Sequence, residues 1–336
     1  MRNAARTTLL MAMLAGPGWA AQPTSELIDA IENGDAAVAD ALLRQEIDPN
    51  AKASDGRTAL TVAAARGELG VVKKLLSLGA NPRLRGLDGV MPIVAAAESG
   101  DSRTVEALIK ALDEPRAMAQ ALLVAVAKGR LSLARALLES GALAPSDPSM
   151  AAAVHLAADH GLADVLELLL DFGADPNGAL ASGESAAYAA VKNGRVETLE
   201  LLLARGAEPN RAESKDGRTA LHQAVEQGRT ECLRLLVGYG ADVNAPDRER
   251  RTPLHLAAAG VYPRVIDVLV SYAAEVDAAD AQGRTPLHQA VASGRGENVR
   301  RLLAAEADPA IPDGAGVTPA QLAQRGRRAD IAALFD

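Results

Sequence analysis

Aromatic residues are scarce in this chain of 336 residues, which contains two Phe, four Tyr and one Trp although 49% of its residues are hydrophobic. A globular core of this size normally gains much of its buried area from large aromatic side chains. The apolar residues here are mainly Ala, Leu and Val, which suit small, repeated contacts between helices. The shortage of aromatics therefore favours a thin helical repeat structure.

Clustered positive charge is also missing. The formal net charge is −8, and no run of Lys or Arg is long enough to follow a phosphate backbone. Affinity for nucleic acid comes largely from clustered cations. We therefore exclude nucleic acid as the main ligand.

Cysteine is represented by Cys232 alone. A single cysteine forms no disulfide within the chain, and the same count excludes a pair of C-x-x-C metal-binding elements. If the chain is exported, it must hold its fold without covalent crosslinks.

Long hydrophobic runs are absent too. The apolar stretch 7–15 is far shorter than the roughly 18–20 residues that span a bilayer. It follows Arg2 and Arg6 and precedes a Pro-Gly pair, and small residues, Gly18 and Ala20, stand at the two positions that signal peptidase reads. This is the three-part pattern of a secretory signal. We predict that residues 1–20 are a signal peptide cleaved after Ala20, the alternative being a disordered leader. The mature chain is then periplasmic or secreted, with no membrane insertion.

Self-similarity dominates the rest of the sequence. Four segments align at once: DGRTALTVAAARG from Asp55, DGRTALHQAVEQG from Asp216, ERRTPLHLAAAG from Glu249 and QGRTPLHQAVASG from Gln282. Each is followed by a second apolar stretch. Weaker copies fill the intervals, so that predicted units begin near residues 22, 55, 88, 117, 149, 182, 216, 249, 282 and 315. Ten units account for residues 21–336.

Each unit carries the start and stop signals of two helices. The first helix follows a Thr or Ser, which is a favoured N-cap residue. These residues are Thr58, Ser185, Thr219, Thr252, Thr285 and Thr318. The second helix has Leu or Val at helical spacing and ends at a Gly, where a left-handed C-cap needs no Cβ. Turn residues, with Asp-Gly last, join one unit to the next. Each unit is thus predicted to be a β-hairpin-like turn and two antiparallel helices.

The period of about 33 residues with Thr-Pro-Leu-His, present at 252–255 and 285–288, is the signature of ankyrin repeats. The chain resembles that family over the whole predicted mature part, 21–336. The resemblance implies an all-α solenoid of about ten stacked units that binds a protein partner through its turn tips and concave face. The short leader, the Ala and Arg content and the lack of disulfides suit a bacterial envelope protein. We expect a monomer.

Four histidines align in the repeats: His155, His222, His255 and His288. The resemblance implies that each binds backbone near the turn and joins neighbouring units. A metal site at His155, Asp159 and His160 would need a third or fourth ligand that the neighbouring units do not offer. Cys232 takes the place of a Val and is interpreted as buried and inert. No nucleophile, phosphate or metal motif stands out, so we expect no metal, no cofactor and no enzymatic activity.

Residues that break the repeat on the binding side are the candidates for partner contacts. In the turn 247–251, an Arg replaces the usual Gly and three arginines cluster: Arg248, Arg250 and Arg251. Arginine can fork two hydrogen bonds onto a carboxylate, so we predict a contact with an acidic partner. The alternative is a solvated charged tip. The neighbouring tips carry Lys215, Arg218 and Arg284, which extend a cationic strip that would steer association.

Two further irregularities are open to two interpretations. Segment 113–116 replaces a turn, which predicts either a notch for a partner or ordinary drift. Gly260 comes one residue early and is followed by Tyr262, which is either an interface anchor or a residue packed between helices.

Two binding functions remain open from the sequence. In the first, the protein is a scaffold or chaperone-like partner of an envelope protein. In the second, it is an inhibitor or immunity protein that plugs a toxic or hydrolytic enzyme.

Overall fold

The computed structural model describes residues 22–45, 47–178, 180, 182–213, 215–326 and 328–335. The predicted signal peptide, 1–20, lies outside them. The described part contains twenty α-helices and the 3-10 helix η1, and an isolated β-bridge joins Lys52 and Thr58. The all-α repeat fold is confirmed. No helix within the described ranges is long and apolar enough to cross a membrane.

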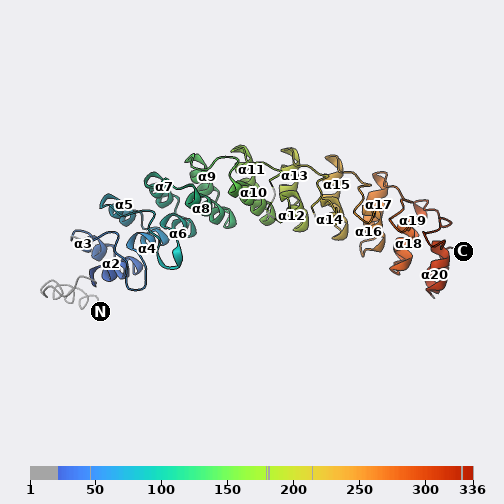
Figure 1. The fold of residues 1–336 in the computed structure, drawn as a ribbon, viewed down its shortest axis with the longest axis horizontal. Coiled ribbons are helices and arrows are strands. Elements are labelled where there is room, and N and C mark those ends of the chain that lie inside the picture. The colour runs from blue at the N-terminus through green and yellow to red at the C-terminus, as the bar shows by residue number, and fades with distance from the viewer. Residues whose placement is uncertain are drawn as a thin grey trace. The chain divides into compact units, whose positions relative to one another are not determined.

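The chain divides into two compact blocks, an N-terminal block that ends at Ala144 and a C-terminal block that starts at Pro145. The N-terminal block consists of α2 (Gln22–Glu32), α3 (Ala36–Leu42), α4 (Ala59–Ala65), α5 (Leu69–Ser77), η1 (Leu87–Gly89), α6 (Pro92–Ser99), α7 (Ser102–Ala111), α8 (Pro115–Ala127) and α9 (Leu131–Glu139). The even-numbered first helices pack on one another, as do the odd-numbered second helices, so that the block has two layers (Figure 1).

The C-terminal block repeats this arrangement. It consists of α10 (Pro148–His160), α11 (Ala163–Asp171), α12 (Ala186–Lys192), α13 (Val196–Ala204), α14 (Ala220–Glu226), α15 (Thr230–Gly238), α16 (Pro253–Ala259), α17 (Arg264–Ser271), α18 (Pro286–Ala292), α19 (Gly296–Ala304), α20 (Pro319–Arg325) and α21 (Ala329–Ala332). First helices again pack on first helices and second helices on second helices (Figure 1).

The helix starts follow the sequence signals. All six predicted Thr and Ser residues are N-caps of first helices. Alanine pairs such as Ala63-Ala64 and Ala257-Ala258 are almost completely buried. Their small side chains let neighbouring first helices approach closely, which explains how a core with so few aromatics is filled.

Two first helices are longer than the sequence pattern indicates. Helices α8 and α10 have 13 residues each, against 7 in α4, α14 and α16. Each starts with a proline, a residue whose fixed φ suits the first helical position. The starts predicted near residues 117 and 149 therefore fall inside helices. In segment 113–116, Glu114 is the N-cap of α8, and Pro115 and Arg116 are its first two residues.

Asparagines in the turns after second helices join neighbouring repeats. The side-chain amides of Asn50, Asn177 and Asn210 donate to the carbonyl of the glycine that follows the second helix of the next repeat, at 2.9–3.0 Å. Their side-chain oxygens accept a backbone N–H from the same segment. The sequence showed the turn but not this link between repeats.

A buried asparagine caps the C-terminal end of α16, which ends one residue early. Gly260 is extended there instead of left-handed, with φ −74° and ψ 179°. The side-chain amide of Asn298, which is 1% exposed, donates to the carbonyls of Ala257, Ala258 and Gly260 at 3.2, 2.8 and 3.0 Å. One side chain on α19 thus satisfies the end of α16.

Replacing Asn298 with alanine is expected to lower the free energy of unfolding by about 2–3 kcal/mol, because buried carbonyls lose their donor. Urea denaturation measures the change, with Asn33→Ala at an exposed position as the control. Equal stability of the two variants would contradict the capping role of Asn298.

Candidate partner-binding surface

Four loops of the C-terminal block precede helices α14, α16, α18 and α20. We call them finger loops and define them as residues 213–218, 247–251, 280–284 and 313–317. In each, the backbone N–H of the first residue donates to the carbonyl of the last, at 2.8–2.9 Å. These closed loops correspond to the predicted β-hairpin-like turns.

Backbone hydrogen bonds also tie each finger loop to the next. The N–H of Arg248 donates to the carbonyl of Asp216, and the N–H of Ala281 donates to that of Glu249, both at 2.8 Å. The last two loops are joined in the same way. The finger loops therefore form a connected row, and no sequence motif had indicated this connection.

In two of these loops, a buried aspartate binds backbone N–H groups of its own loop and also binds an arginine side chain, which we call a captured arginine. Asp247 and Asp280 are 5% and 2% exposed. Oδ1 of Asp247 accepts the backbone N–H groups of Glu249 and Arg251, and Oδ2 accepts the side-chain Nε of Arg251, all at 2.9 Å. Asp280 holds Arg284 in the same way. Burial by itself raises the pKa of Asp247, but the hydrogen bonds from Arg251 and the backbone hold it below its usual value.

The cationic strip predicted along these loops is divided into two groups. Arg251 and Arg284 are the two captured arginines, and Arg218 forms an ion pair with Glu226 at 2.6 Å. All three are partly buried. Their charges are matched within the protein. These ion pairs were not predicted from the sequence, although the Asp-x-x-x-Arg spacing shared by the two captured arginines is a signal that could have indicated them.

The other three predicted cations lie exposed at the loop tips. They are Lys215, Arg248 and Arg250, and within the described residues none of them forms an ion pair. The backbone of Arg250 is left-handed, with φ 61°. The equivalent position in the other three finger loops is a glycine, Gly217, Gly283 or Gly316, with φ between 71° and 76°. Arg250 is therefore an exposed cation held in a conformation that favours glycine.

Tyr262 stands where other repeats have an arginine. Its ring lies against Gly228, since a Cβ on that glycine would be 2.5 Å from the ring Cγ. At the equivalent place Arg195 lies over Gly161. Tyr262 is still 45% exposed and follows the exposed Val261. The ring thus packs on the preceding repeat and also presents an apolar surface to solvent.

The histidines of the three Thr-x-Leu-His segments, His222, His255 and His288, are buried. Each Nδ1 accepts the backbone N–H of the N-cap threonine three residues earlier at 3.1–3.2 Å, so the proton of the neutral ring is on Nε2. Nε2 faces a carbonyl of the next finger loop at 2.9–3.5 Å. Burial lowers the pKa of His222 and of His255. The bridging role implied by the family resemblance is confirmed for these three.

His155 does not share that role, so the interpretation based on its alignment was wrong. It lies in the middle of α10, and the N-cap of this long helix is Asp147, more than two turns before His155, instead of a threonine three residues before it. Its Nε2 is buried and has no hydrogen-bond partner among the described residues. Within the same part of the chain, no group of three or more His, Cys, Asp or Glu side chains fits a metal ion. Cys232 is buried and unpaired, as predicted.

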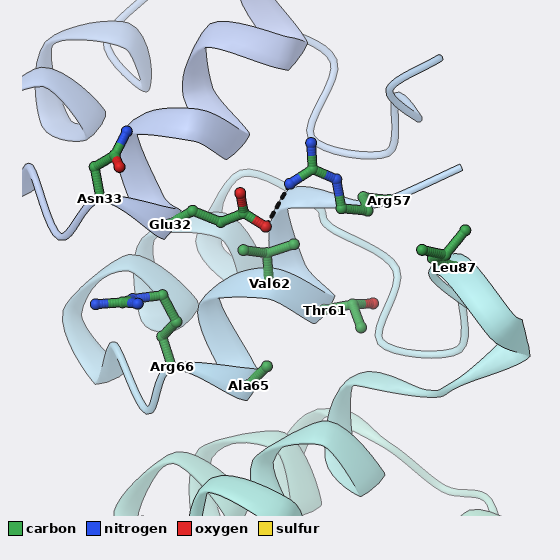
Figure 2. A pocket seen from close by; sticks show the side chains of 8 residues that line it. All are labelled: Glu32, Asn33, Arg57, Thr61, Val62, Ala65, Arg66 and Leu87. Atoms are coloured by element: carbon green, nitrogen blue, oxygen red, sulfur yellow. Dashed lines mark ion pairs between the residues drawn. The ribbon is translucent and has the colours of Figure 1, made fainter. Parts of the chain in front are cut away.

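The N-terminal block carries a groove of about 510 Å³ between α2, α4 and η1 (Figure 2). Along one side, Arg57 forms an ion pair with Glu32, and further pairs with Asp55 and Asp29. The hydrogen bond to Glu32 is the largest influence that raises the pKa of Arg57. This arginine is therefore held in place and its charge is matched.

The apolar side of this groove exists because a small residue occupies the histidine position. Thr61 stands three residues after the N-cap Thr58, where later repeats have His. The shorter side chain leaves room above Val62 and Ala65, and Leu87 of η1 borders the space (Figure 2). Leu87 is 49% exposed. This groove was not predicted from the sequence, although the Thr at the histidine position is visible in the aligned segments.

Comparison with known families agrees with the repeat geometry. The family described as ankyrin repeats (3 copies) matches residues 9–86, 27–119, 154–247 and 245–313. No curated protein matches the chain. Ankyrin repeats are generally protein–protein interaction modules, and the family is typically non-catalytic. The matched residues cover most of the sequence, and the chain therefore belongs to the ankyrin-repeat family.

Proposed function

We propose that this protein is a non-catalytic binding module that grips an acidic segment of a protein partner through its finger-loop tips. The contacts come from Lys215, Arg248 and Arg250. The N-terminal signal pattern supports a site of action in the bacterial periplasm or outside the cell, as a monomer. The observation that carries the proposal is the left-handed backbone of Arg250.

A residue other than glycine in this conformation costs about 1–2 kcal/mol. Strained residues of this kind cluster where they serve binding or catalysis. Arg250 contributes no ion pair to the described fold, so its side chain brings no visible stability in return. An exposed guanidinium is suited to a forked contact with a carboxylate of the partner.

Replacing Arg250 with glycine is expected to raise the stability of the fold and weaken partner binding. We expect a gain of about 0.5–1 kcal/mol, since relief of the left-handed strain exceeds the added flexibility of glycine. Loss of one charge-assisted pair should weaken binding by about 10–100-fold. Urea denaturation and affinity capture of proteins from an envelope extract measure the two effects on the chain from Ala21 onward.

The chain offers matched controls for this experiment. Ala273 and Glu306 are also left-handed, with φ 62° and 65°, at the ends of second helices. Ala273→Gly and Glu306→Gly should gain similar stability and still capture the same partner as the unaltered chain. A partner captured equally well by all three glycine variants would contradict the proposal.

The captured partner also distinguishes the two roles left open by the sequence. If it is a hydrolytic or toxic enzyme that the unaltered chain inhibits and the Arg250→Gly chain does not, the protein is an inhibitor. A partner whose activity is unchanged by binding indicates a scaffold.

A further inference from the structure

The second-helix layer of the N-terminal block contains a groove with positive charge in an otherwise acidic protein. The groove lies between α5 and α7 and has a volume of about 430 Å³. Its apolar lining is Leu69, Leu76 and Ala107. Three cations, Lys73, Arg103 and Lys110, accompany a single carboxylate, that of Glu106. The groove is thus both apolar and cationic, although the chain carries a net charge of −8.

Two of these cations are not used by the fold. Arg103 lies 3.6 Å from Asp101 and is matched by it. Lys73 and Lys110 are exposed, and in the described ranges neither forms an ion pair. Their charges are therefore available to a ligand.

The equivalent groove in the C-terminal block shows that the repeat does not require this charge. That groove lies between α11 and α13 and has a volume of about 310 Å³. At the positions equivalent to Lys73 and Arg103 it has Glu167 and Glu197. The same helix pairing accommodates either sign, so packing alone does not explain the cations between α5 and α7.

We propose that the groove between α5 and α7 binds an amphipathic acidic helix of a protein partner. The lining from Leu69 to Leu76 extends over about 10 Å at 1.5 Å per residue, which corresponds to two turns of a bound helix. Apolar side chains at positions i, i+3 and i+7 of that helix would occupy the groove. Carboxylates beside them would reach Lys73 and Lys110. The site uses second helices and is independent of the finger-loop tips.

A synthetic 18-residue helical peptide tests the site directly. The probe has Leu at i, i+3 and i+7 with Glu beside them, and its control has Lys in place of every Glu. Fluorescence anisotropy with the whole chain should show binding of the acidic probe at least ten times tighter than that of the basic control. Lys73→Glu with Arg103→Glu should abolish this difference, because these changes introduce the residue type of the other block.

Two further variants separate the groove from net charge and misfolding. Lys74→Glu with Lys128→Glu changes the net charge equally at exposed positions outside the groove, and should reduce probe affinity less than threefold. Ala107→Leu introduces the residue type found at the equivalent position, Leu201, so this variant should fold. The larger side chain fills part of the groove and should weaken binding of the acidic probe about tenfold.

Several outcomes would overturn the proposal. One is equal binding of the acidic and basic probes, and another is equal loss in the two charge-reversed chains. A third is sedimentation of the unaltered chain as a dimer that Lys73→Glu with Arg103→Glu dissociates, which would assign the groove to a second copy. Arg250→Gly should leave probe affinity unchanged, so failure of this proposal and failure of the finger-loop proposal are distinguishable.

Discussion

Replacing Asp247 with alanine is expected to lower the free energy of unfolding by about 3 kcal/mol. The side chain is almost fully buried and accepts two backbone N–H groups and the guanidinium of Arg251. Its removal leaves those donors unsatisfied and the arginine without its buried partner. Because the finger loops are joined through their backbones, the loop at 213–218 should lose order as well.

Asp313 provides the matched comparison for Asp247. Its carboxylate accepts the same two backbone N–H groups within its own loop, at 2.9 Å, but it is partly exposed and captures no arginine. Asp313→Ala should therefore cost only about 1 kcal/mol. Urea denaturation of both variants measures the difference. Equal losses would show that the captured arginine contributes nothing to the loop.

Acidification from pH 7.5 to 5 is expected to destabilise the protein through two buried histidines. Burial lowers the pKa of His222 and of His255 in the folded state, while in the unfolded chain they titrate near 6.5. As the pH falls below about 6.5, the unfolded state takes up protons first, so the free energy of unfolding decreases. The loss reaches at most about 1.4 kcal/mol per pH unit for each histidine.

Glutamine is the substitution that isolates this titration. Gln321 occupies the equivalent position in the last repeat, where its side-chain oxygen accepts the N–H of the N-cap Thr318 at 3.2 Å. The double variant His222→Gln with His255→Gln should keep both helix starts, lose stability at pH 7.5, and show a flatter dependence on pH down to 5. Urea denaturation at intervals of half a pH unit measures the slope, and an unchanged slope would contradict the assignment.

Acid should act on Asp247 in a lower pH range. Its carboxylate pKa lies below the usual value, so its contribution is fully present at neutral pH and is lost only as the pH falls through that lowered pKa. The histidine effect between pH 7.5 and 5 is therefore separable from protonation of the finger-loop aspartates.

The local signals of the repeat were sufficient to predict most of the fold. These signals are the N-cap threonines, the glycines after second helices and the spacing of Leu and Val. Each acts within one or two helical turns, so it can be recognised in the sequence alone. The replacement of Gly by Arg250 was visible for the same reason. Cys232 could be placed in the core because the aligned repeats have an apolar residue there.

The charges of the finger loops could not be interpreted in this way. From the sequence, Arg218, Arg251 and Arg284 can be identified only as cations. Whether a carboxylate lies within reach of each depends on how the loop closes. Burial of Asp247 and Asp280 decides that question and removes two of the arginines from the exposed strip. The predicted role of His155 was wrong for a similar reason. Its position in the alignment matched the other histidines, but the extra turns of α10 changed its surroundings.

The sequence by itself thus determined the repeat period, the helix pairs and the family, because these follow from short-range signals repeated along the chain. Only the tertiary structure decided which cations are exposed, how Asn298 completes α16, and where the grooves lie. The exposure of the cations depends on how each loop closes over a buried carboxylate. The cap of α16 and the grooves depend on residues some 30 to 40 positions apart that meet only when the repeats stack, and burial then fixes the strength of their interactions.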